Sequence, residues 1–228
     1  MDISILQRSS ILSVLMSASF LLPATAQEAA QEPQVIPLEE WDYLGEWDTG
    51  WSVEEFMDEA QVYGVDGEEI GTIENVLIGE DNRIVAAVVE VGGFIDIGDT
   101  HVAVPWDDIQ FSVHAVTVPV EEDNIGEYSL FESDQSGARQ DVWKATDVLD
   151  DYARVEGKGY GYVDDLIFNN DGVLTAVIIN SDVVFGGGPR AFPWNGDPAA
   201  PTYELPYDEA EVIEQAPFDR EQLEGEPQ

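Results

Sequence analysis

Residues 70–78, Ile-Gly-Thr-Ile-Glu-Asn-Val-Leu-Ile, return in altered form at residues 160–168 as Tyr-Gly-Tyr-Val-Asp-Asp-Leu-Ile-Phe. Two more stretches around this one recur as well. Residues 51–60 (WSVEEFMDEA) match residues 143–152 (WKATDVLDDY), and residues 104–106 (VPW) match residues 192–194 (FPW). The matches keep one order along the chain, and the small gaps between them fall in turns. Such an arrangement is typical of an internal repeat, so we expect two copies of one module, at residues 51–120 and 143–196.

Each copy has the local patterns of a small β-rich module. Ser52 followed by Glu55 is a capping-box pattern, which predicts a short helix over about residues 53–58. Strands are expected from the apolar and alternating patterns, with turns at Gly, Asn and Asp between them; they lie at residues 61–63, 71–78, 84–91, 102–106 and 109–118. Several short strands in so few residues favour an all-β class, with two small antiparallel barrels in tandem and short helices.

Eight residues recur at matching places and are expected to have structural roles. Gly71 and Gly161 are predicted to hold matching tight backbone positions. The others are two prolines and four tryptophans: Pro105, Pro193, Trp51, Trp106, Trp143 and Trp194. The tryptophans either pack in the core and at the barrel ends or form a recognition surface, since Trp is common at interface hot spots. The aromatic and acidic stretch at residues 41–51 is either a strap over an open apolar barrel face or a partner-binding arm.

Several of these segments together resemble the PRC-barrel family, named after a domain of the photosynthetic reaction-centre H subunit. The resemblance is carried by residues 62–64, 67–71, 76–78, 91–95, 97–99 and 102–106. It covers about residues 51–110 well, and the second copy more loosely through residues 152–155, 159–166 and 192–194. The layout also resembles exported tandem PRC-barrel proteins of alphaproteobacteria. The resemblance implies a small β-barrel used as an interaction or scaffold module, with no catalytic residues to carry over.

The charge of the chain excludes several classes of function. Its 228 residues hold 48 Asp and Glu against 8 Lys and Arg, a formal net charge of −40. Such a surface repels phosphate backbones and anionic lipids, so nucleic-acid binding and a membrane-surface role are not expected. The chain has no cysteine, which excludes thiol nucleophiles, thiolate metal sites and disulfides. The family also includes a domain of a ribosome-maturation factor. Photosynthetic and ribosomal roles are not inferred from the resemblance, because this chain has a cleavable-looking signal in place of a transmembrane anchor, carries two barrels and is too acidic to sit on RNA.

The N-terminal segment is predicted to be a cleavable signal peptide over residues 1–26. Arg8 precedes an apolar run from Ile11 to Leu22, which is shorter than the roughly 20 residues that span a bilayer. The small-x-small pattern Ala24-Thr25-Ala26 then suits a signal peptidase. We expect a soluble mature protein in a bacterial periplasm, or alternatively a secreted one, without membrane insertion. The remaining divisions are an acidic and aromatic extension (27–50), a linker (121–142) and an acidic, Pro-rich tail (197–228).

Few residues are candidates for chemistry. Asp96, Asp99 and His101 could hold a cation, although the polar groups of this segment also suit a turn and strand. Asp164 and Asp165 should point to opposite faces of a strand, because successive side chains alternate. No catalytic residue and no cofactor-binding residue is predicted.

We therefore expect a non-catalytic exported scaffold or protein-interaction protein of the bacterial envelope, with a protein partner that the sequence does not identify. The alternative is an acidic periplasmic protein that binds divalent cations such as calcium, at least weakly. A hydrolase that uses carboxylates in a cleft is the third and least favoured possibility.

Overall fold

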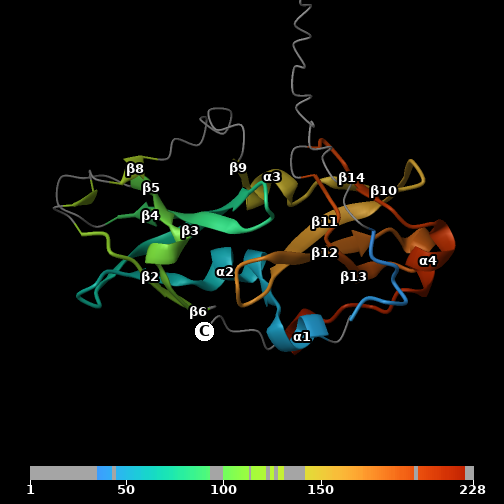
Figure 1. Cartoon of the computed structure of the whole chain (residues 1–228), viewed down its shortest axis with the longest axis horizontal. Coiled ribbons are helices and arrows are strands. Elements are labelled where there is room, and N and C mark those ends of the chain that lie inside the picture. The colour runs from blue at the N-terminus through green and yellow to red at the C-terminus, as the bar shows by residue number, and fades with distance from the viewer. Residues whose placement is uncertain are drawn as a thin grey trace, which may run out of the picture. The chain divides into compact units, whose positions relative to one another are not determined.

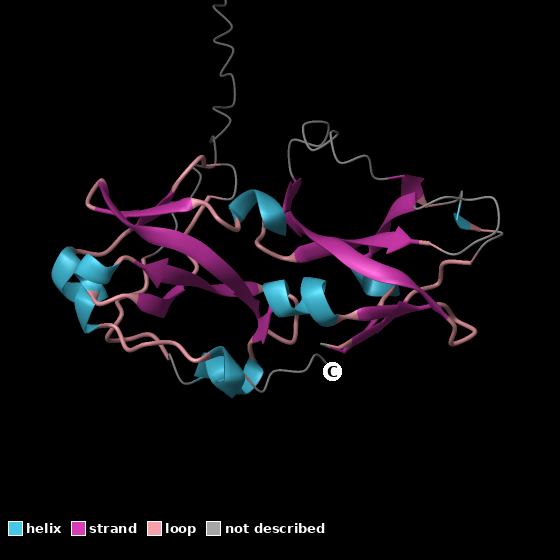
Figure 2. Ribbon diagram, turned by 180° about the vertical axis from the view of Figure 1, so that it is seen from behind, coloured by secondary structure: helices cyan, strands magenta, loops and turns pink. Residues whose placement is uncertain are grey.

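The computed structural model describes residues 35–42, 45–92, 100–112, 114–121, 124–125, 128–130, 142–197 and 200–223. The predicted signal peptide, Asp96, Asp99 and most of the linker lie outside these residues. Strands are the commonest element of the described part, and its helices are short (Figures 1 and 2). This confirms the predicted all-β class. No helix among the described residues is both long and apolar enough to cross a membrane.

The first sheet has the strand order β6-β7-β2-β3-β4-β5-β8, with β9 attached to β3. Its strands are β2 (Gln61–Tyr63), β3 (Glu69–Gly79), β4 (Ile84–Val91), β5 (Thr100–Pro105), β6 (Gln110–Ser112), β7 (Ala115–Thr117), β8 (Ser129–Leu130) and β9 (Val142–Lys144). The single strand expected at residues 109–118 is instead the hairpin of β6 and β7. The β7 strand then pairs with β2 in parallel, a departure from the purely antiparallel barrel that the sequence predicts.

The second sheet repeats this topology with the order β13-β12-β11-β10-β14. Its strands are β10 (Tyr152–Val155), β11 (Lys158–Phe168), β12 (Leu174–Ser181), β13 (Gly188–Pro193) and β14 (Tyr203–Leu205), with β1 (Trp51–Ser52) attached to β11. The parallel pairing of β14 with β10 corresponds to that of β7 with β2. Because β14 belongs to this sheet, the second module extends beyond residue 196, into the segment assigned to the tail from the sequence.

The helices are α1 (Gly45–Thr49), α2 (Val53–Glu59), α3 (Ala145–Val148) and α4 (Glu209–Glu214), with single 3-10 turns η1 (Trp106–Asp108), η3 (Val183–Phe185) and η4 (Arg220–Gln222). The helix predicted after Ser52 is confirmed, because the Ser52 hydroxyl accepts a hydrogen bond from the backbone N–H of Glu55 at 3.0 Å. The helix α4 lies within the segment assigned to the tail from the sequence. The α2 helix lies between the two sheets and contacts both β3 and β11 (Figure 1).

The two modules exchange their first strands. In the first joint, β1 from the start of module 1 pairs with β11 of module 2, with Trp51 opposite Phe168. In the second joint, β9 from the start of module 2 pairs with β3 of module 1, with Trp143 opposite Ile78. The turns of the hairpins β3–β4 and β11–β12 also meet, since Ile84 N–H donates to the Gly172 carbonyl at 3.0 Å. Each module therefore completes the sheet of the other.

One hydrophobic core runs through both modules. It includes Trp51, Phe56, Val76 and Val89 from module 1 and Tyr160, Leu166 and Phe192 from module 2. A second, smaller cluster comprises Ile167, Ala176, Ile178, Ala191 and Phe218. Trp41 and Trp47 pack against the second cluster, so the described part of the N-terminal extension covers an apolar sheet face, as a strap would. Tyr43 of the same stretch lies outside the described residues.

Gly71 and Gly161 lie at matching points of β3 and β11, where the neighbouring strand approaches closely. Gly71 is opposite Val91, and Gly161 is opposite Ser181. A Cβ atom on Gly71 would lie 1.8 Å from the carbonyl oxygen of Glu90, and one on Gly161 would lie 2.2 Å from that of Asn180. Neither position can take a side chain unless the neighbouring strand moves.

Candidate functional site

Of the three residues predicted as a weak metal site, only His101 is described. Its Nε2 forms an ion pair with a carboxylate oxygen of Glu74, and potential ligand atoms of Glu74, Glu90 and His101 lie within 4.8 Å of one another. Glu74 and Glu90 were not predicted as ligands from the sequence, because they come from other strands. The strand register was the signal that could have found Glu90, since it lies directly opposite His101.

The recurring tryptophans lie where the modules meet. Trp51 is 1% exposed, stacks on Trp106 and Phe168, and donates from Nε1 to the Asn169 carbonyl at 3.0 Å. Trp194 donates from Nε1 to Asn82 Oδ1 in the other module, also at 3.0 Å. Trp143, in β9, is half-buried. These positions support the packing alternative over a recognition surface.

The recurring prolines occupy matching positions in the sheets. Pro105 lies opposite Ala86, and Pro193 lies opposite Ala176. Pro105 is exposed, whereas Pro193 is buried.

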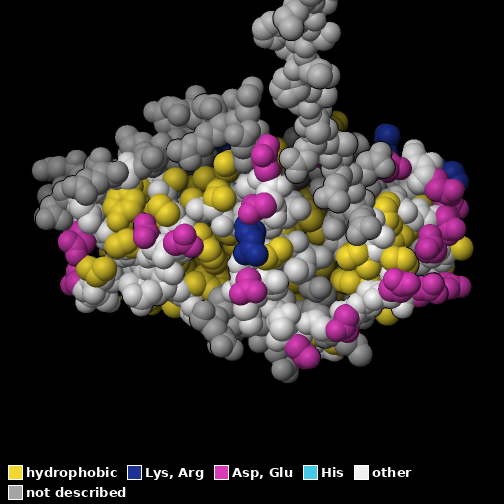
Figure 3. Space-filling model, in the orientation of Figure 1, with side chains coloured by type: hydrophobic (Ala, Val, Ile, Leu, Met, Phe, Trp, Pro, Cys, Tyr) yellow, Lys and Arg dark blue, Asp and Glu magenta, His cyan; other side chains and the backbone are white. Residues whose placement is uncertain are grey.

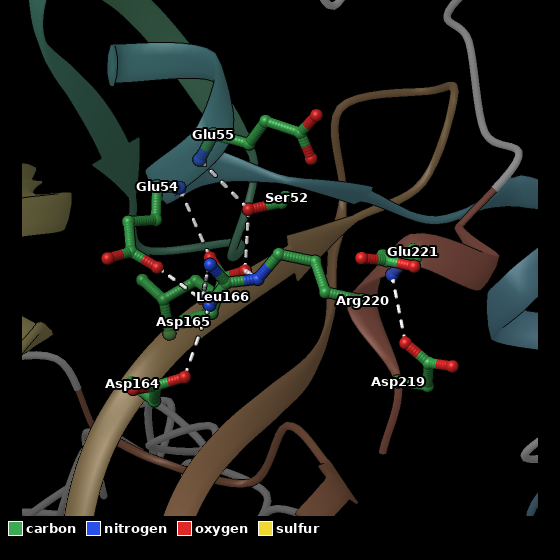
Figure 4. Close-up of polar contacts among 9 residues, drawn as sticks. All are labelled: Ser52, Glu54, Glu55, Asp164, Asp165, Leu166, Asp219, Arg220 and Glu221. Atoms are coloured by element: carbon green, nitrogen blue, oxygen red, sulfur yellow. Dashed lines mark hydrogen bonds and ion pairs between the residues drawn. The ribbon is translucent and has the colours of Figure 1, made fainter. Parts of the chain in front are cut away.

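The most distinctive polar site lies at the first joint, around the buried Asp165. This residue is 0% exposed, although it belongs to an otherwise apolar part of β11. Its Oδ2 accepts from the Ser52 hydroxyl at 2.5 Å, and its Oδ1 accepts from the backbone N–H of Glu54 at 3.1 Å and of Leu166 at 2.8 Å (Figure 4). Asp165 thereby holds the beginning of α2 against the other module.

Arg220, in η4 of the C-terminal segment, reaches this carboxylate and two others. Its Nε lies 3.2 Å from Asp165 Oδ2, while its Nη2 lies 3.1 Å from Asp164 Oδ2 and 2.6 Å from Glu54 Oε2 (Figure 4). The expectation that Asp164 and Asp165 point to opposite faces was wrong, because both contact one guanidinium group. The register shift between Val163 and Asp165 explains this, since it marks a β-bulge that interrupts the alternation of side chains.

Burial and the neighbouring cation act in opposite directions on Asp165. Removal from water raises the pKa of this carboxyl from 3.8 to about 7, while Arg220 and the hydrogen bonds from Ser52 and the backbone limit the rise. For Arg220, burial alone would lower the pKa, but Asp165, Glu54 and Asp164 outweigh it and raise the pKa. The site therefore groups three carboxyl groups around one guanidinium. The innermost of them, Asp165, depends on this arginine of the tail for its cation.

At the second joint, the positions that match Asp165 and Glu54 hold the neutral residues Asn75 and Thr146, while Lys144 matches Ser52. Asn75 corresponds to Asp165, and its Oδ1 accepts from the backbone N–H of Val76 at 2.9 Å and of Thr146 at 3.4 Å. Its Nδ2 donates to the Thr146 hydroxyl at 2.6 Å. Thr146 is the counterpart of Glu54 at the beginning of α3. The two carboxylates of the first joint thus have neutral counterparts at the second joint.

A pocket of about 330 Å³ opens beside Arg220. Besides Arg220, it is lined by Glu54, Glu55, Asp58, Glu59, Glu221 and Leu223. Glu59 also contacts His114, whose Nδ1 lies 3.6 Å from Glu59 Oε2. Acidic side chains are also spread widely over the face shown in Figure 3, with apolar side chains between them. The pocket combines this negative character with a concave shape, so it is suited to a cationic group.

Neither Arg220 nor this pocket was predicted from the sequence. One signal was available, namely a lone arginine in an acidic tail together with two aspartates in the otherwise apolar run of residues 163–168. The pairing of two segments so distant in sequence could only come from the fold.

The family model of the PRC-barrel domain matches residues 58–125. No curated protein matched the chain. The matched segment begins within α2 and includes β2 to β7, the strands whose sequence resembles the family. The resemblance is therefore confirmed for the first module, which contains a PRC-barrel domain at residues 58–125. The looser resemblance of the second copy stays a prediction.

Proposed function

We propose that this protein is a non-catalytic scaffold that binds another protein in the bacterial envelope. The observation that carries the proposal is the reciprocal strand exchange, which joins a PRC-barrel domain and a second module of the same topology through one core. Such a unit offers a preformed surface, which lowers the ordering cost of binding. The apolar run from Ile11 to Leu22 and the Ala24-Thr25-Ala26 pattern support export.

The geometry of the polar site supports a binding role over a catalytic one. Asp165, the residue with the most perturbed environment among the carboxylates, is fully buried and fully engaged by Ser52, two backbone N–H groups and Arg220. A general acid or base must reach the substrate or a bridging water. The site around Asp165 is therefore better suited to holding the two modules together than to acting on a substrate.

Crosslinking in intact cells tests the proposal. The full chain with a C-terminal affinity tag is crosslinked, purified and analysed by mass spectrometry, and cells carrying an unrelated exported acidic protein serve as control. We expect a specific protein to be enriched from the envelope fraction. Recovery of only the proteins found with the control would contradict the scaffold function, as would turnover in a screen of glycan and ester substrates.

A second candidate function is divalent-cation binding, as predicted from the acidic composition. The observation in its favour is the grouping of Glu74, Glu90 and His101 on neighbouring strands. Calorimetry with calcium and with zinc on the full chain, compared with a Glu74→Gln/Glu90→Gln variant, would test it. We expect saturable binding better than about millimolar that the variant loses; equal heats from both proteins would indicate general screening and exclude this site.

A further inference from the structure

A comparison of the two joints shows that the strand exchange does not need the carboxylates of the first joint. Asn75 and Thr146 hold the second joint together with neutral hydrogen bonds. Asp165 and Glu54 occupy the matching positions of the first joint and both carry carboxylates. Since the two joints have the same strand exchange, the fold by itself does not require a charge at either position.

These extra carboxylates are explained by the guanidinium that they surround. A buried carboxylate is costly unless a cation and hydrogen bonds compensate it, and Asp165 is 0% exposed. Its cation comes from the C-terminal segment, outside the sequence repeat, and no counterpart of Arg220 contacts Asn75 among the described residues. The first joint thus differs from the second by having an arginine-binding site.

The geometry of this site suits an arginine. One guanidinium nitrogen, Nε, faces Asp165, and another, Nη2, faces both Asp164 and Glu54. A planar fork with several donors can serve three carboxylates at once, whereas the ammonium of a lysine is a single point charge. The site therefore selects for the shape of the cation as well as for its charge.

Arg220 is accessible enough to be exchanged. Its side chain is 35% exposed, and it lies at the wall of the 330 Å³ pocket. Among the described residues, Glu55, Asp58 and Glu221 of this pocket form no ion pair with a Lys or Arg, so the negative charge extends beyond the site that Arg220 fills. In Figure 4, Glu54 points to the guanidinium while Glu55 extends away from it. An approaching basic segment would find both attraction and space here.

We propose that Asp165, Asp164 and Glu54 form an arginine-binding site that Arg220 fills within the chain, and that an arginine of a basic segment in the partner protein fills it in exchange. This inference rests on the proposed scaffold function and gives the chemistry of the partner. The C-terminal segment is then an internal competitor, held upstream by the buried Phe218, whose N–H donates to the Pro189 carbonyl at 2.8 Å. Only the residues after Phe218 have to move for the exchange.

Chemical rescue of the full chain with Arg220→Ala tests the site directly. Millimolar ethylguanidinium should raise the melting temperature of R220A, because it restores the missing cation, and should leave the wild type unchanged, because Arg220 already occupies the site. Ethylammonium at the same ionic strength should have a clearly smaller effect. If R220A is unfolded by itself, recovery of its folded circular dichroism spectrum with ethylguanidinium is the supporting result.

The matched control comes from the second joint. In R220A/D165N the site acquires the neutral residue found at position 75, so ethylguanidinium should no longer stabilise the protein, with binding weakened about tenfold or more. Equal rescue of R220A and R220A/D165N would overturn the inference. Equal rescue of R220A by ethylguanidinium and ethylammonium would also overturn it, as would no rescue by either cation.

Crosslinking with the same variants separates this inference from the scaffold function. R220A should capture more of the partner than the wild type does, and R220A/D165N should lose that gain. Capture of one partner to the same extent by all three proteins would overturn the arginine site and leave the scaffold function standing. Absence of any partner, together with successful rescue of R220A, would contradict the scaffold function and with it the proposed occupant.

Discussion

At the scale of single residues, Asp165 and Asn75 show that one position of the repeat can be ionisable in one copy and neutral in the other. Both side chains bind backbone N–H groups at the beginning of a helix in the other module. Only Asp165 couples this contact to pH, because burial raises the pKa of its carboxyl to about 7. The folded protein therefore retains a proton that the unfolded chain releases at lower pH.

The Asp165→Asn variant should remove this pH dependence. The pKa of Asp165 is higher in the folded state than its usual 3.8, so its contribution to the free energy of unfolding is complete below about pH 4 and is lost as the pH rises through about 7. Urea denaturation of both proteins between about pH 5 and 8 gives the difference between them, in which the other titrating groups largely cancel. We expect the wild type to lose stability relative to the variant over this range; a constant difference would contradict the raised pKa.

Substitution of Gly71 or Gly161 by valine should destabilise the protein by about 1–3 kcal/mol or more, because a side chain there collides with the backbone of the next strand. Glu80→Val, at an exposed turn, is the control, for which we expect a change within about 0.5 kcal/mol. Chemical denaturation measures all three. Similar small effects at the three sites would show that β3 and β11 are not in close contact with their neighbours at these glycines.

At the scale of elements, the exchanged strands β1 and β9 are equivalent in sequence but not in burial. Trp51 in β1 is 1% exposed and stacks with two aromatic rings, whereas Trp143 in β9 is half-buried. Trp51→Ala should therefore cost about 3–5 kcal/mol of stability, and Trp143→Ala clearly less. Equal losses in denaturation experiments would mean that the two joints contribute equally to the core.

Much of each module could be predicted from sequence, because local patterns determine it. The Ser52 cap, the strands β3 and β4 and the tight glycines all follow from residues close together in the chain. The exchange of β1 and β9 could not be predicted, since strands of two or three residues have the same pattern whether they pair within their module or across. The strand β14 was missed for a similar reason, because its three residues lie within a segment rich in Pro and acids.

The same limit applies to the site. A β-bulge changes the facing of Asp164 and Asp165 without any local signature that alternation rules detect. The contact of Arg220 with Asp165 joins residues that are far apart in the chain and has no period or motif. Composition indicated an acidic surface, but only the fold shows that one of the few cations of the chain is placed at a joint between modules.

At the scale of the whole molecule, the net charge of −40 opposes compactness. Salt screens this repulsion, since the Debye length falls from about 30 Å at 0.01 M to about 8 Å at 0.15 M ionic strength. The melting temperature of the full chain should therefore rise over that range, as followed by circular dichroism. Sodium chloride and tetramethylammonium chloride should act alike if screening is the cause, and an unchanged melting temperature in both would contradict it.

The crossing of the first strands has a consequence for the order of events during synthesis. Trp51 leaves the ribosome early, but its indole N–H donates to the carbonyl of Asn169, 118 positions later. The strand β1 therefore has no partner to pair with until β11, in the second module, has been synthesised. A premature stop before β11 would leave β1 without its partner strand, so the fold of the first module depends on a much later part of the chain.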